Sequence, residues 1–481
     1  MLFGLLLSLA LSQAHAIGLD SKVRKLAQGP LLAPAQWGLM VKDAQTGKVV
    51  LSFNSDKRLI PGSTLKLFVT AAALSELGPE HRFVTVLHHD GVVAAGRLKG
   101  SLVLRGGGDP TLGSDLARGG KPMEGVFAGW RKALADKGID SVEGGVLADN
   151  SIFEGTPIPG SWGWEDSGNY YAAPADGLSI NDNLYRLSLN VGARVGEPAA
   201  VLRVEPEVPD LVLDNRLTIG PTEAGDNGFI HNVPGSYRPV LRGSVPAGAR
   251  EFVIKGALPE PALFAAQAFA SYLKKSGVRV LGQARLSDGP VPVDEAKVLA
   301  RTESVPLREI VRVTNKRSFN FYAEMLSRAI ALRQGRPGSV EGAGAAVNAF
   351  LRSAGIPAEA VRLADACGLS RLDLATAAAL TDVLVFMSKS PAFSDYQDSL
   401  VFPGDLESFS RFKEKGKGTL LESSLRIKTG SLSGARSYAG YLKTKSGRLL
   451  AFAFIVDHYA GSARDIEKLH ADLLLDLAQS R

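Results

Sequence analysis

The sequence predicts an α/β (α+β) protein in which an antiparallel sheet flanked by helices, together with a helical cluster, is interrupted by inserted, largely β material. Three observations support this fold class. Strand-like segments lie near both ends of the 481-residue chain, helical periodicity returns after residue 300, and residues 83–300 contain short β-type segments broken by Gly and Pro. We therefore expect the two ends to build one domain around the insertion.

The composition is that of a globular protein. With 45% hydrophobic and 22% charged residues, the chain can bury a large core, and its length allows two to four domains. The formal net charge of +6 would suit an anionic polymer such as cell wall but does not indicate nucleic-acid binding. Cys367 is the single cysteine, which excludes an intramolecular disulfide and a cysteine metal cluster.

The N-terminus predicts export. Leu2–Leu11 form a short apolar run, and Ala14-His15-Ala16 fits a small-residue cleavage site. The run is too short to span a bilayer, and no later segment reaches spanning length. We expect residues 1–16 to be a signal peptide and the mature chain, starting near Ile17, to be a soluble envelope protein with no transmembrane anchor.

A predicted hairpin leads into the most informative helix of the chain. Trp37–Asp43 and Val49–Phe53 flank a turn, and the segment Pro61–Leu74 follows as a turn and a helix that is apolar nearly all round. Such a helix is buried. Ser63 and Lys66 project from the same face at its start because they are three residues apart.

Ser63 and Lys66 have the residue types of a nucleophile and its base. Serine attacks a carbonyl only when another group takes its proton, and a buried lysine can do so because burial disfavours its charged form. The alternative is that Ser63 caps the helix while Lys66 reaches water, since a lone S-x-x-K recurs by chance. Further motifs must decide between the two interpretations.

The remaining elements are expected in the following order. Strands of the insertion are predicted at Leu102–Leu104, Val146–Ala148 and Val201–Glu205, and the turn-rich stretch Ala175–Arg250 is expected to be a module of its own. Helices are predicted at Leu307–Val313, Phe321–Leu332, Ala343–Ala354 and Leu374–Met387. The C-terminal part is predicted to contain strands at Leu425–Gly430, Tyr438–Leu442 and Leu449–Val456 and a helix from Ala463.

The last helix is expected to pack on the sheet. Ile466, Leu469, Leu473 and Leu477 share one face, and the polar face is not basic, which argues against attachment to a membrane.

Two further motifs accompany Ser63 and Lys66. Ser318-Phe319-Asn320 lies just before a predicted helix, and Lys428-Thr429-Gly430 lies on a predicted strand. Each motif is weak alone, but S-x-x-K, S-x-N and K-T-G in this order and with this local structure form a strong signal. The sequence resembles the penicillin-recognising serine enzymes.

The spacing of the motifs narrows the resemblance. Ser63 and Ser318 are 255 positions apart, the difference between 318 and 63, which is similar to the class C low-molecular-mass penicillin-binding proteins, D-alanyl-D-alanine carboxypeptidases/endopeptidases with two nested domains there. Other matches to that family are Leu77–Glu80, Gly106–Leu112, Trp164–Pro174, Gly368–Arg371 and Ala439–Tyr441.

The resemblance covers essentially the whole mature chain and implies its domains. A β-lactamase/transpeptidase-like catalytic domain would comprise residues 17–82 and 301–481. Inserted domain II would comprise residues 83–180 and 251–300, and nested domain III residues 181–250.

The resemblance also implies the roles of the motif residues. Ser63 would be the acylated nucleophile and Lys66 its general base, while Ser318 would relay the proton. Asn320 would orient Lys66 and the substrate amide. Lys428 would supply a second cation, whose charge further favours neutral Lys66.

Substrate contacts are implied in the same way. Thr429 and Ser431, on either side of Gly430, would hold the terminal carboxylate, and the backbone N–H groups of Ser63 and Ser431 would form the oxyanion hole. By the same resemblance, the diamino-acid side chain of the peptide would meet Asp166, Tyr171 and Arg371.

The sequence departs from the family pattern at Phe319, at Cys367, which replaces a serine, and in the loop Phe402–Glu407. These departures put the shape of the pocket in doubt. Rival sites fail, because the chain has no G-x-S-x-G, H-E-x-x-H or G-x-x-x-x-G-K-[ST] motif. His88-His89 is expected to be a surface pair, and Gly342–Val347 to be small-residue helix packing.

We therefore expect a periplasmic serine D-Ala-D-Ala carboxypeptidase, D,D-endopeptidase or both, with no metal or organic cofactor. Its expected partners are peptidoglycan peptides that end in or are cross-linked through D-alanine, and β-lactams. A serine β-lactamase is one alternative, although it would need a second positioned base to deacylate the enzyme. A non-catalytic cell-wall-binding protein on the same scaffold is another.

Overall fold

The computed structural model describes residues 19–192, 194–248, 251–408, 414 and 416–480. The expected signal peptide therefore lies outside the described residues. No helix in the described part of the chain is both long enough and apolar enough to cross a bilayer. The chain divides into two compact units, each considered by itself below: Met1–Glu80, Leu307–Arg336 and Val340–Arg481 form the first, and His81–Pro306 with Pro337–Ser339 form the second.

A five-stranded sheet with the order β2-β1-β23-β22-β21 organises the first unit. β1 (Gln36–Asp43) and β2 (Val49–Phe53) form the predicted N-terminal hairpin. β21 (Leu425–Leu432), β22 (Ala435–Lys443) and β23 (Leu449–Asp457) come from the other end of the chain, and β1 pairs with β23. All pairings are antiparallel. The two chain ends therefore share one sheet.

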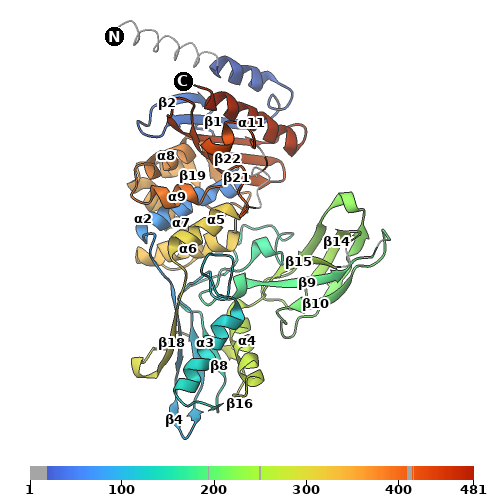
Figure 1. The fold of residues 1–481 in the computed structure, drawn as a ribbon, viewed down its shortest axis with the longest axis vertical. Helices are drawn as coiled ribbons and strands as arrows, with labels where there is room; N and C mark the ends of the chain where they lie inside the picture. The colour runs from blue at the N-terminus through green and yellow to red at the C-terminus, as the bar shows by residue number, and fades with distance from the viewer. Residues whose placement is uncertain (1–18, 193, 249–250, 409–413, 415, 481) are drawn as a thin grey trace. The chain divides into compact units, whose positions relative to one another are not determined.

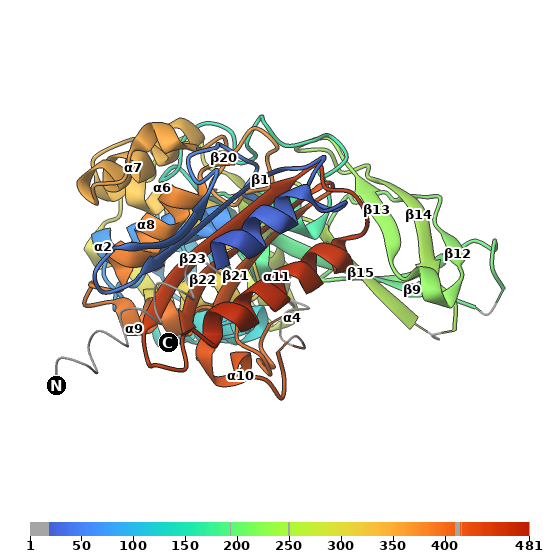
Figure 2. The same cartoon turned by 90° about the horizontal axis from the view of Figure 1, so that it is seen from above.

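Helices cover both faces of this sheet (Figures 1 and 2). On one face lies α11 (Ala463–Ala478), whose Ile466, Leu473 and Leu477 join a buried cluster with apolar side chains of the strands. The predicted packing of the last helix on the sheet is thus confirmed. On the other face, α8 (Ala377–Met387) packs against β1 and β23.

The apolar helix predicted after Pro61 is the buried centre of the first unit. A single 3-10 turn, η1 (Gly62–Leu65), leads into α2 (Lys66–Glu76), in which every residue from Lys66 to Leu74 is buried. Helices pack around it as expected for a helix that is apolar all round. The helices in contact with α2 are α5 (Leu307–Lys316), α6 (Asn320–Arg333), α7 (Val340–Ser353), α8 and α9 (Phe393–Asp398).

The first unit also contains a short strand pair and a short helix. These are β19 (Val361–Arg362), β20 (Leu374–Ala375) and α10 (Leu421–Ser424). In α7, Gly342, Ala343 and Ala346 are buried where the helix meets α6, so the prediction of small-residue helix packing is confirmed.

The second unit contains a five-stranded sheet with the order β17-β8-β6-β3-β18 and a four-stranded sheet with the order β16-β7-β5-β4. The strands of the first sheet are β17 (Arg285–Leu286), β8 (Val146–Asp149), β6 (Leu102–Arg105), β3 (Val84–His89) and β18 (Val298–Glu303). The strands of the second are β16 (Arg279–Val280), β7 (Ser141–Val142), β5 (Arg97–Lys99) and β4 (Val92–Ala94).

Two helices of this unit were not predicted. α3 (Met123–Asp136) contains two glycines, which lower helix propensity, but Val126, Trp130 and Leu134 recur at helical spacing and are buried. α4 (Pro261–Lys275) opens with a proline at its first position, a sequence signal for a helix start. Tertiary packing of an apolar face outweighs weak local propensity in α3.

Two further small sheets lie in the second unit. One has the order β10-β9-β15, and the other joins β11, β14 and β12, with β13 also paired to β14. Their strands are β9 (Leu184–Asn190), β10 (Ala200–Glu205), β11 (Asp214–Asn215), β12 (Thr218–Gly220), β13 (Asn227–His231), β14 (Val240–Pro246) and β15 (Glu251–Ala257). Nested domain III was expected to end at residue 250, but β15 begins after that residue and pairs with β9, which lies before it. The first of these sheets therefore contains strands from both sides of the expected boundary.

The expectation for His88-His89 was wrong. Both residues are buried, with 1% and 9% of their surfaces exposed. They lie on β3, which is flanked by β6 and β18 within the sheet, so the pair is part of the sheet interior.

Candidate active site

Ser63 and Lys66 lie at the junction between the 3-10 turn and α2. Ser63 is not a helix cap, because the cap positions are Pro61 for the turn and Leu65 for α2. Lys66 is fully buried and does not reach water. The structure thus excludes the interpretation of this motif as a helix cap followed by a surface lysine.

The Lys66 amine lies among three oxygens. Its Nζ is 2.9 Å from Ser63 Oγ, 2.6 Å from Asn320 Oδ1 and 2.5 Å from the carbonyl oxygen of Cys367. Asn320 is the first residue of α6, and α6 packs against α2, so the packing of two helices sets its distance from Lys66.

A second lysine and serine form a parallel pair. Lys428 Nζ on β21 donates to Ser318 Oγ at 2.9 Å and to the carbonyl of Thr429 at 2.8 Å. Ser318 has a φ of 56°, a left-handed conformation that is uncommon for a non-glycine residue and recurs at functional sites. The five residues of the predicted catalytic set therefore form two hydrogen-bonded groups, Ser63–Lys66–Asn320 and Ser318–Lys428. The groups are close enough for the charge of Lys66 to lower the pKa of Lys428.

Both lysines have lowered pKa values. Burial lowers the pKa of Lys66, although the neighbouring carboxylates, among them Asp365 and Glu324, oppose that shift. Burial and then the charge of Lys66 lower the pKa of Lys428 well below its ordinary value. Because coupling between two charges is reciprocal, a proton on one amine disfavours a proton on the other. Without substrate, the site is therefore suited to keep one of the two lysine amines neutral, the form that can accept a proton.

Two glycines let the Ser63 turn and β21 approach closely. A Cβ added to Gly62 would lie 3.0 Å from the backbone nitrogen of Ser431, and one added to Gly430 would lie 3.0 Å from the backbone nitrogen of Ser63. The side chain of Ser437 on β22 ties the two together, because it donates to the carbonyl of Pro61. The two N–H groups expected to form an oxyanion hole are therefore on neighbouring segments.

The other predicted substrate contacts of the first unit lie around the end of β21. Thr429 is half-buried, whereas Ser431 and Arg371 are exposed. The guanidinium of Arg371 donates to the carbonyl of Ser433 at 3.0 Å, which holds it beside the strand end that carries Ser431.

Asp166 and Tyr171 belong to the second unit, where they contact each other. Both are half-buried, and burial together with the hydrogen-bonded carboxylate of Asp166 raises the pKa of Tyr171. The side-chain amide of Asn169 donates to the carbonyl of Asp166, and its oxygen accepts from the backbone of Ile230 at 2.9 Å, which anchors this loop to β13.

The three departures from the family pattern have separate structural outcomes. Phe319 is buried and packs edge-on against Tyr322, with ring centroids 4.9 Å apart. Cys367 is buried, burial raises the pKa of its thiol, and it meets Lys66 through its carbonyl. In the loop Phe402–Glu407, Asp405 accepts a hydrogen bond from Lys316 at 2.9 Å between two buried side chains.

Sequence reasoning missed the carboxylates behind Lys66. Glu324, Asp365 and Asp373 are all buried, and Glu324 pairs with Arg328 at 3.1 Å. Two signals were available: Glu324 and Arg328 are four residues apart on one helix, and Asp365 precedes a Gly-containing turn.

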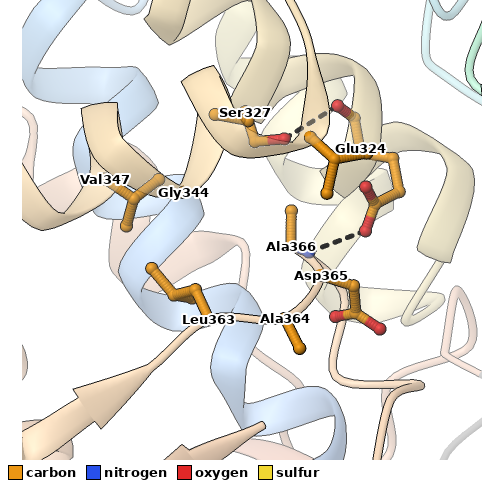
Figure 3. Close-up of a pocket in the computed structure, with 10 residues that line it drawn as sticks. Glu324, Ser327, Gly344, Val347, Leu363, Ala364, Asp365 and Ala366 are labelled. Carbon is orange, nitrogen blue, oxygen red and sulfur yellow. Dashed lines mark hydrogen bonds between the residues drawn. The ribbon is translucent and has the colours of Figure 1, made fainter. Parts of the chain in front are cut away.

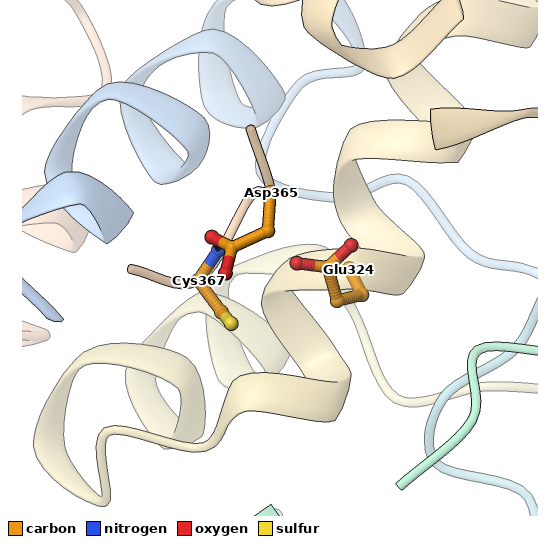
Figure 4. A group of neighbouring side chains, drawn as sticks. All are labelled: Glu324, Asp365 and Cys367. Carbon is orange, nitrogen blue, oxygen red and sulfur yellow. Dashed lines mark hydrogen bonds between the residues drawn. The ribbon is translucent and has the colours of Figure 1, made fainter. Parts of the chain in front are cut away.

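Glu324, Asp365 and Cys367 are close enough together to be considered as metal ligands, since their ligand atoms lie within 4.8 Å of one another (Figure 4). Both carboxylates already accept hydrogen bonds, Glu324 from Arg328 and Ala366 and Asp365 from backbone N–H groups. The group therefore fits a hydrogen-bonded loop better than a cation site.

Comparisons with known proteins identify a matching family and relatives with named activities. The model of the D-Ala-D-Ala carboxypeptidase 3 (S13) family matches residues 19–476. The chain is 29% identical over 460 residues to a D-alanyl-D-alanine carboxypeptidase of Actinomadura sp. (strain R39), covering 94% of this chain and 83% of that protein. It is 26% identical over 470 residues to D-alanyl-D-alanine carboxypeptidase DacB of Haemophilus influenzae, covering 97% and 93%.

Solved structures give the same fold. The crystal structure of penicillin binding protein 4 (dacB) from Haemophilus influenzae matches with a TM-score of 0.78 and 24% identity, covering 94% of this chain and 97% of that one. Another crystal structure of that protein contains a β-lactam, with a TM-score of 0.74. The predicted α/β transpeptidase-like fold is confirmed.

Proposed function

The chain belongs to the D-Ala-D-Ala carboxypeptidase 3 (S13) family, and on this premise we propose that it hydrolyses peptidoglycan stem peptides or their cross-links through an acyl-enzyme on Ser63. The family match also confirms the predicted resemblance to class C penicillin-binding proteins and the serine-type carboxypeptidase activity. One observation carries the proposal: a fully buried amine, Lys66 Nζ, lies 2.9 Å from the hydroxyl of Ser63.

Acylation would begin with a proton transfer from Ser63 to neutral Lys66. Ser63 Oγ then attacks the carbonyl of the peptide bond that precedes the terminal D-alanine, and negative charge develops on the carbonyl oxygen. The backbone N–H groups of Ser63 and Ser431 would stabilise that charge. Ser318 would pass a proton to the leaving amine, and water would then hydrolyse the acyl-enzyme.

The lowered pKa of Lys428 fits a role that begins when substrate binds. A substrate carboxylate held by Thr429 and Ser431 would lie near Lys428 and favour its charged form, because an opposite charge raises the pKa of an amine. Through their coupling, the protonated Lys428 would in turn keep Lys66 neutral. Substrate binding would thus prepare the base for its task.

The diamino-acid side chain of the peptide is proposed to meet Asp166, Tyr171 and Arg371. The support is chemical: a free amine on that side chain needs an acceptor, and Asp166 offers a half-buried carboxylate on an anchored loop. Arg371 is exposed and its guanidinium lies beside the end of β21, where it could bind a carboxylate on the same peptide side chain.

We place the enzyme in the periplasm, from the apolar run and cleavage signal of residues 1–16, and include β-lactams among its ligands. A β-lactam presents a carbonyl and a carboxylate to the same groups as the peptide. Turnover of β-lactams is not favoured, because Glu324, a buried carboxylate behind Lys66, is engaged by Arg328 and by the backbone of Ala366 and is unsuited to activate a deacylating water.

Incubation with defined muropeptides, followed by mass spectrometry of the products, tests the proposal. Loss of one alanine from pentapeptides or conversion of cross-linked dimers to monomers supports it and shows which reaction dominates. Binding of peptidoglycan without any product would instead favour the cell-wall-binding alternative, and rapid multiple turnover of penicillin would favour the β-lactamase.

A further inference from the structure

The partners of Lys66 determine where its lone pair points. A neutral amine has two N–H groups and one lone pair, and a carbonyl or amide oxygen can only accept a hydrogen bond. Asn320 Oδ1 and the Cys367 carbonyl, at 2.6 and 2.5 Å, would accept both hydrogens. The lone pair is then left for Ser63 at 2.9 Å, the one neighbour of the three that has a proton to give.

We propose that the loop Ala364–Ser370 positions the catalytic base: its Cys367 carbonyl orients neutral Lys66 toward Ser63, and Asp365 is the positioning residue that holds this carbonyl in place. This proposal rests on the proposed function in one respect, because its experiment measures acylation of Ser63.

Asp365 holds the loop by four consecutive backbone N–H groups. Its Oδ1 accepts from Cys367 at 2.8 Å and from Gly368 at 2.6 Å. Its Oδ2 accepts from Leu369 at 3.0 Å and from Ser370 at 2.7 Å. Hydrogen bonds to a carboxylate are about twice as strong as those between neutral groups, so the peptide unit of Cys367 and its carbonyl have a fixed direction.

Two further buried carboxylates hold the start of the same loop. Asp373 Oδ1 accepts from the backbone of Ala364 at 2.7 Å and of Asp365 at 3.2 Å, and Glu324 Oε1 accepts from Ala366 at 2.7 Å (Figure 3). Every N–H group from residue 364 to residue 370 therefore donates to a buried carboxyl group. Burying carboxyl groups is costly: burial raises the pKa of Asp373 to about 10 and also raises the pKa of Glu324. A turn that served packing alone would not need three such groups.

The loop packs tightly against the Ser63 turn on one side and borders a small cavity on the other. A Cβ added to Gly368, whose φ is +81°, would lie 1.9 Å from the carbonyl of Gly62, so the loop touches the residue before Ser63. Between α6, α7 and the stretch Leu363–Ala366 there is a cavity of about 10 Å³, close to the room that one water molecule needs (Figure 3). Contact with Gly62 therefore restrains the loop on one side, and the hydrogen bonds to the buried carboxyl groups hold it on the side of the cavity.

The test compares acylation by a β-lactam in wild type and in Asp365→Asn. Second-order rate constants are measured at the pH plateau of each variant, so that a changed pKa of Lys66 is not mistaken for a changed orientation. An amide cannot accept all four N–H groups, so the carbonyl shifts, and we expect a loss of about ten- to a hundredfold. The matched control is Asp149→Asn in the second unit, a buried aspartate that accepts two backbone N–H groups and a hydroxyl. It should acylate at the wild-type rate per folded molecule.

A double-mutant cycle separates positioning from general loss of structure. If Asn320 and the loop orient the same amine, the combined variant Asn320→Ala/Asp365→Asn should lose no more than about threefold beyond the larger single loss. Losses that multiply would overturn the proposal, as would a wild-type plateau for Asp365→Asn.

A second variant covers the case in which Asp365→Asn does not fold. Asp365→Glu keeps the charge but lengthens the side chain by one methylene, and we expect it also to lower the plateau about tenfold or more. A wild-type plateau for this variant would refute the positioning role. Absence of acylation in the wild-type enzyme would instead count against the proposed function.

Discussion

Replacement of Asn320 by alanine probes the orientation of the catalytic base. The change removes an acceptor 2.6 Å from a fully buried amine. Leaving a buried N–H donor without its acceptor costs about 1–3 kcal/mol. If the loss falls on the acylation step, the rate constant should decrease about five- to a hundredfold. Stopped-flow measurement of β-lactam acylation, with thermal unfolding to count folded enzyme, checks this value.

The matched control is Asn315→Ala. Asn315 is buried in α5 of the same unit but donates to Thr70 and Ser399, so its loss should lower stability without lowering acylation per folded molecule. An Asn320→Ala enzyme that acylates within about twofold of wild type would refute the reasoning. Asn320→Asp gives a further check, because a carboxylate beside Lys66 favours the charged amine and should move the rise of acylation with pH to higher pH.

Three other predictions concern the two lysines, Asp166 and Asp109. Lys66→Arg should abolish acylation because arginine keeps its proton, whereas Lys428→Arg should retain part of it; the reverse order of measured rates would contradict both roles. Asp166→Ala should lower kcat/KM about five- to a hundredfold for peptides with a free side-chain amine but barely change β-lactam acylation; equal effects with and without the amine would count against this contact. Burial raises the pKa of Asp109 to about 6, so its folded form binds a proton more tightly than its unfolded form. Its contribution to stability therefore increases by about 1 kcal/mol as pH falls from 7 to 5. The unfolding free energy of wild type minus that of Asp109→Asn should rise by the same amount, because asparagine does not titrate. A difference that is independent of pH would refute the raised pKa of Asp109.

The architecture of the first unit was largely predictable. Its strands alternate or run apolar, its helices have clear periods, and α2 is apolar on every side, so local pattern and burial agree. The motif residues Ser63, Asn320 and Lys428 could be assigned to one site because their order and local structure matched a known pattern.

The second unit was less predictable because its local signals are weak. Many of its strands have only two to four residues, too few to show an alternation, and α3 carries glycines that local propensity disfavours. Residues Asp166 and Tyr171 were named by resemblance alone, and their role remains a proposal.

Local sequence carried signals for Glu324 and Asp365 individually, but it could not place them together with Asp373 behind Lys66. Three carboxyl groups bind the backbone of one loop: Glu324 belongs to α6, Asp365 lies within the loop, and Asp373 follows it. Only the fold brings them together. The exposure of His88 and His89 was misjudged for a similar reason, since the burial of a strand depends on its neighbours in the sheet.

The central claim is that Ser63 is the acylated nucleophile. Its most direct test is the intact mass of the protein after treatment with penicillin, followed by peptide mapping. We predict one adduct per chain, on the peptide that contains Ser63, and none in Ser63→Ala. An adduct that persists in Ser63→Ala, or one that maps to another peptide, would contradict the assignment.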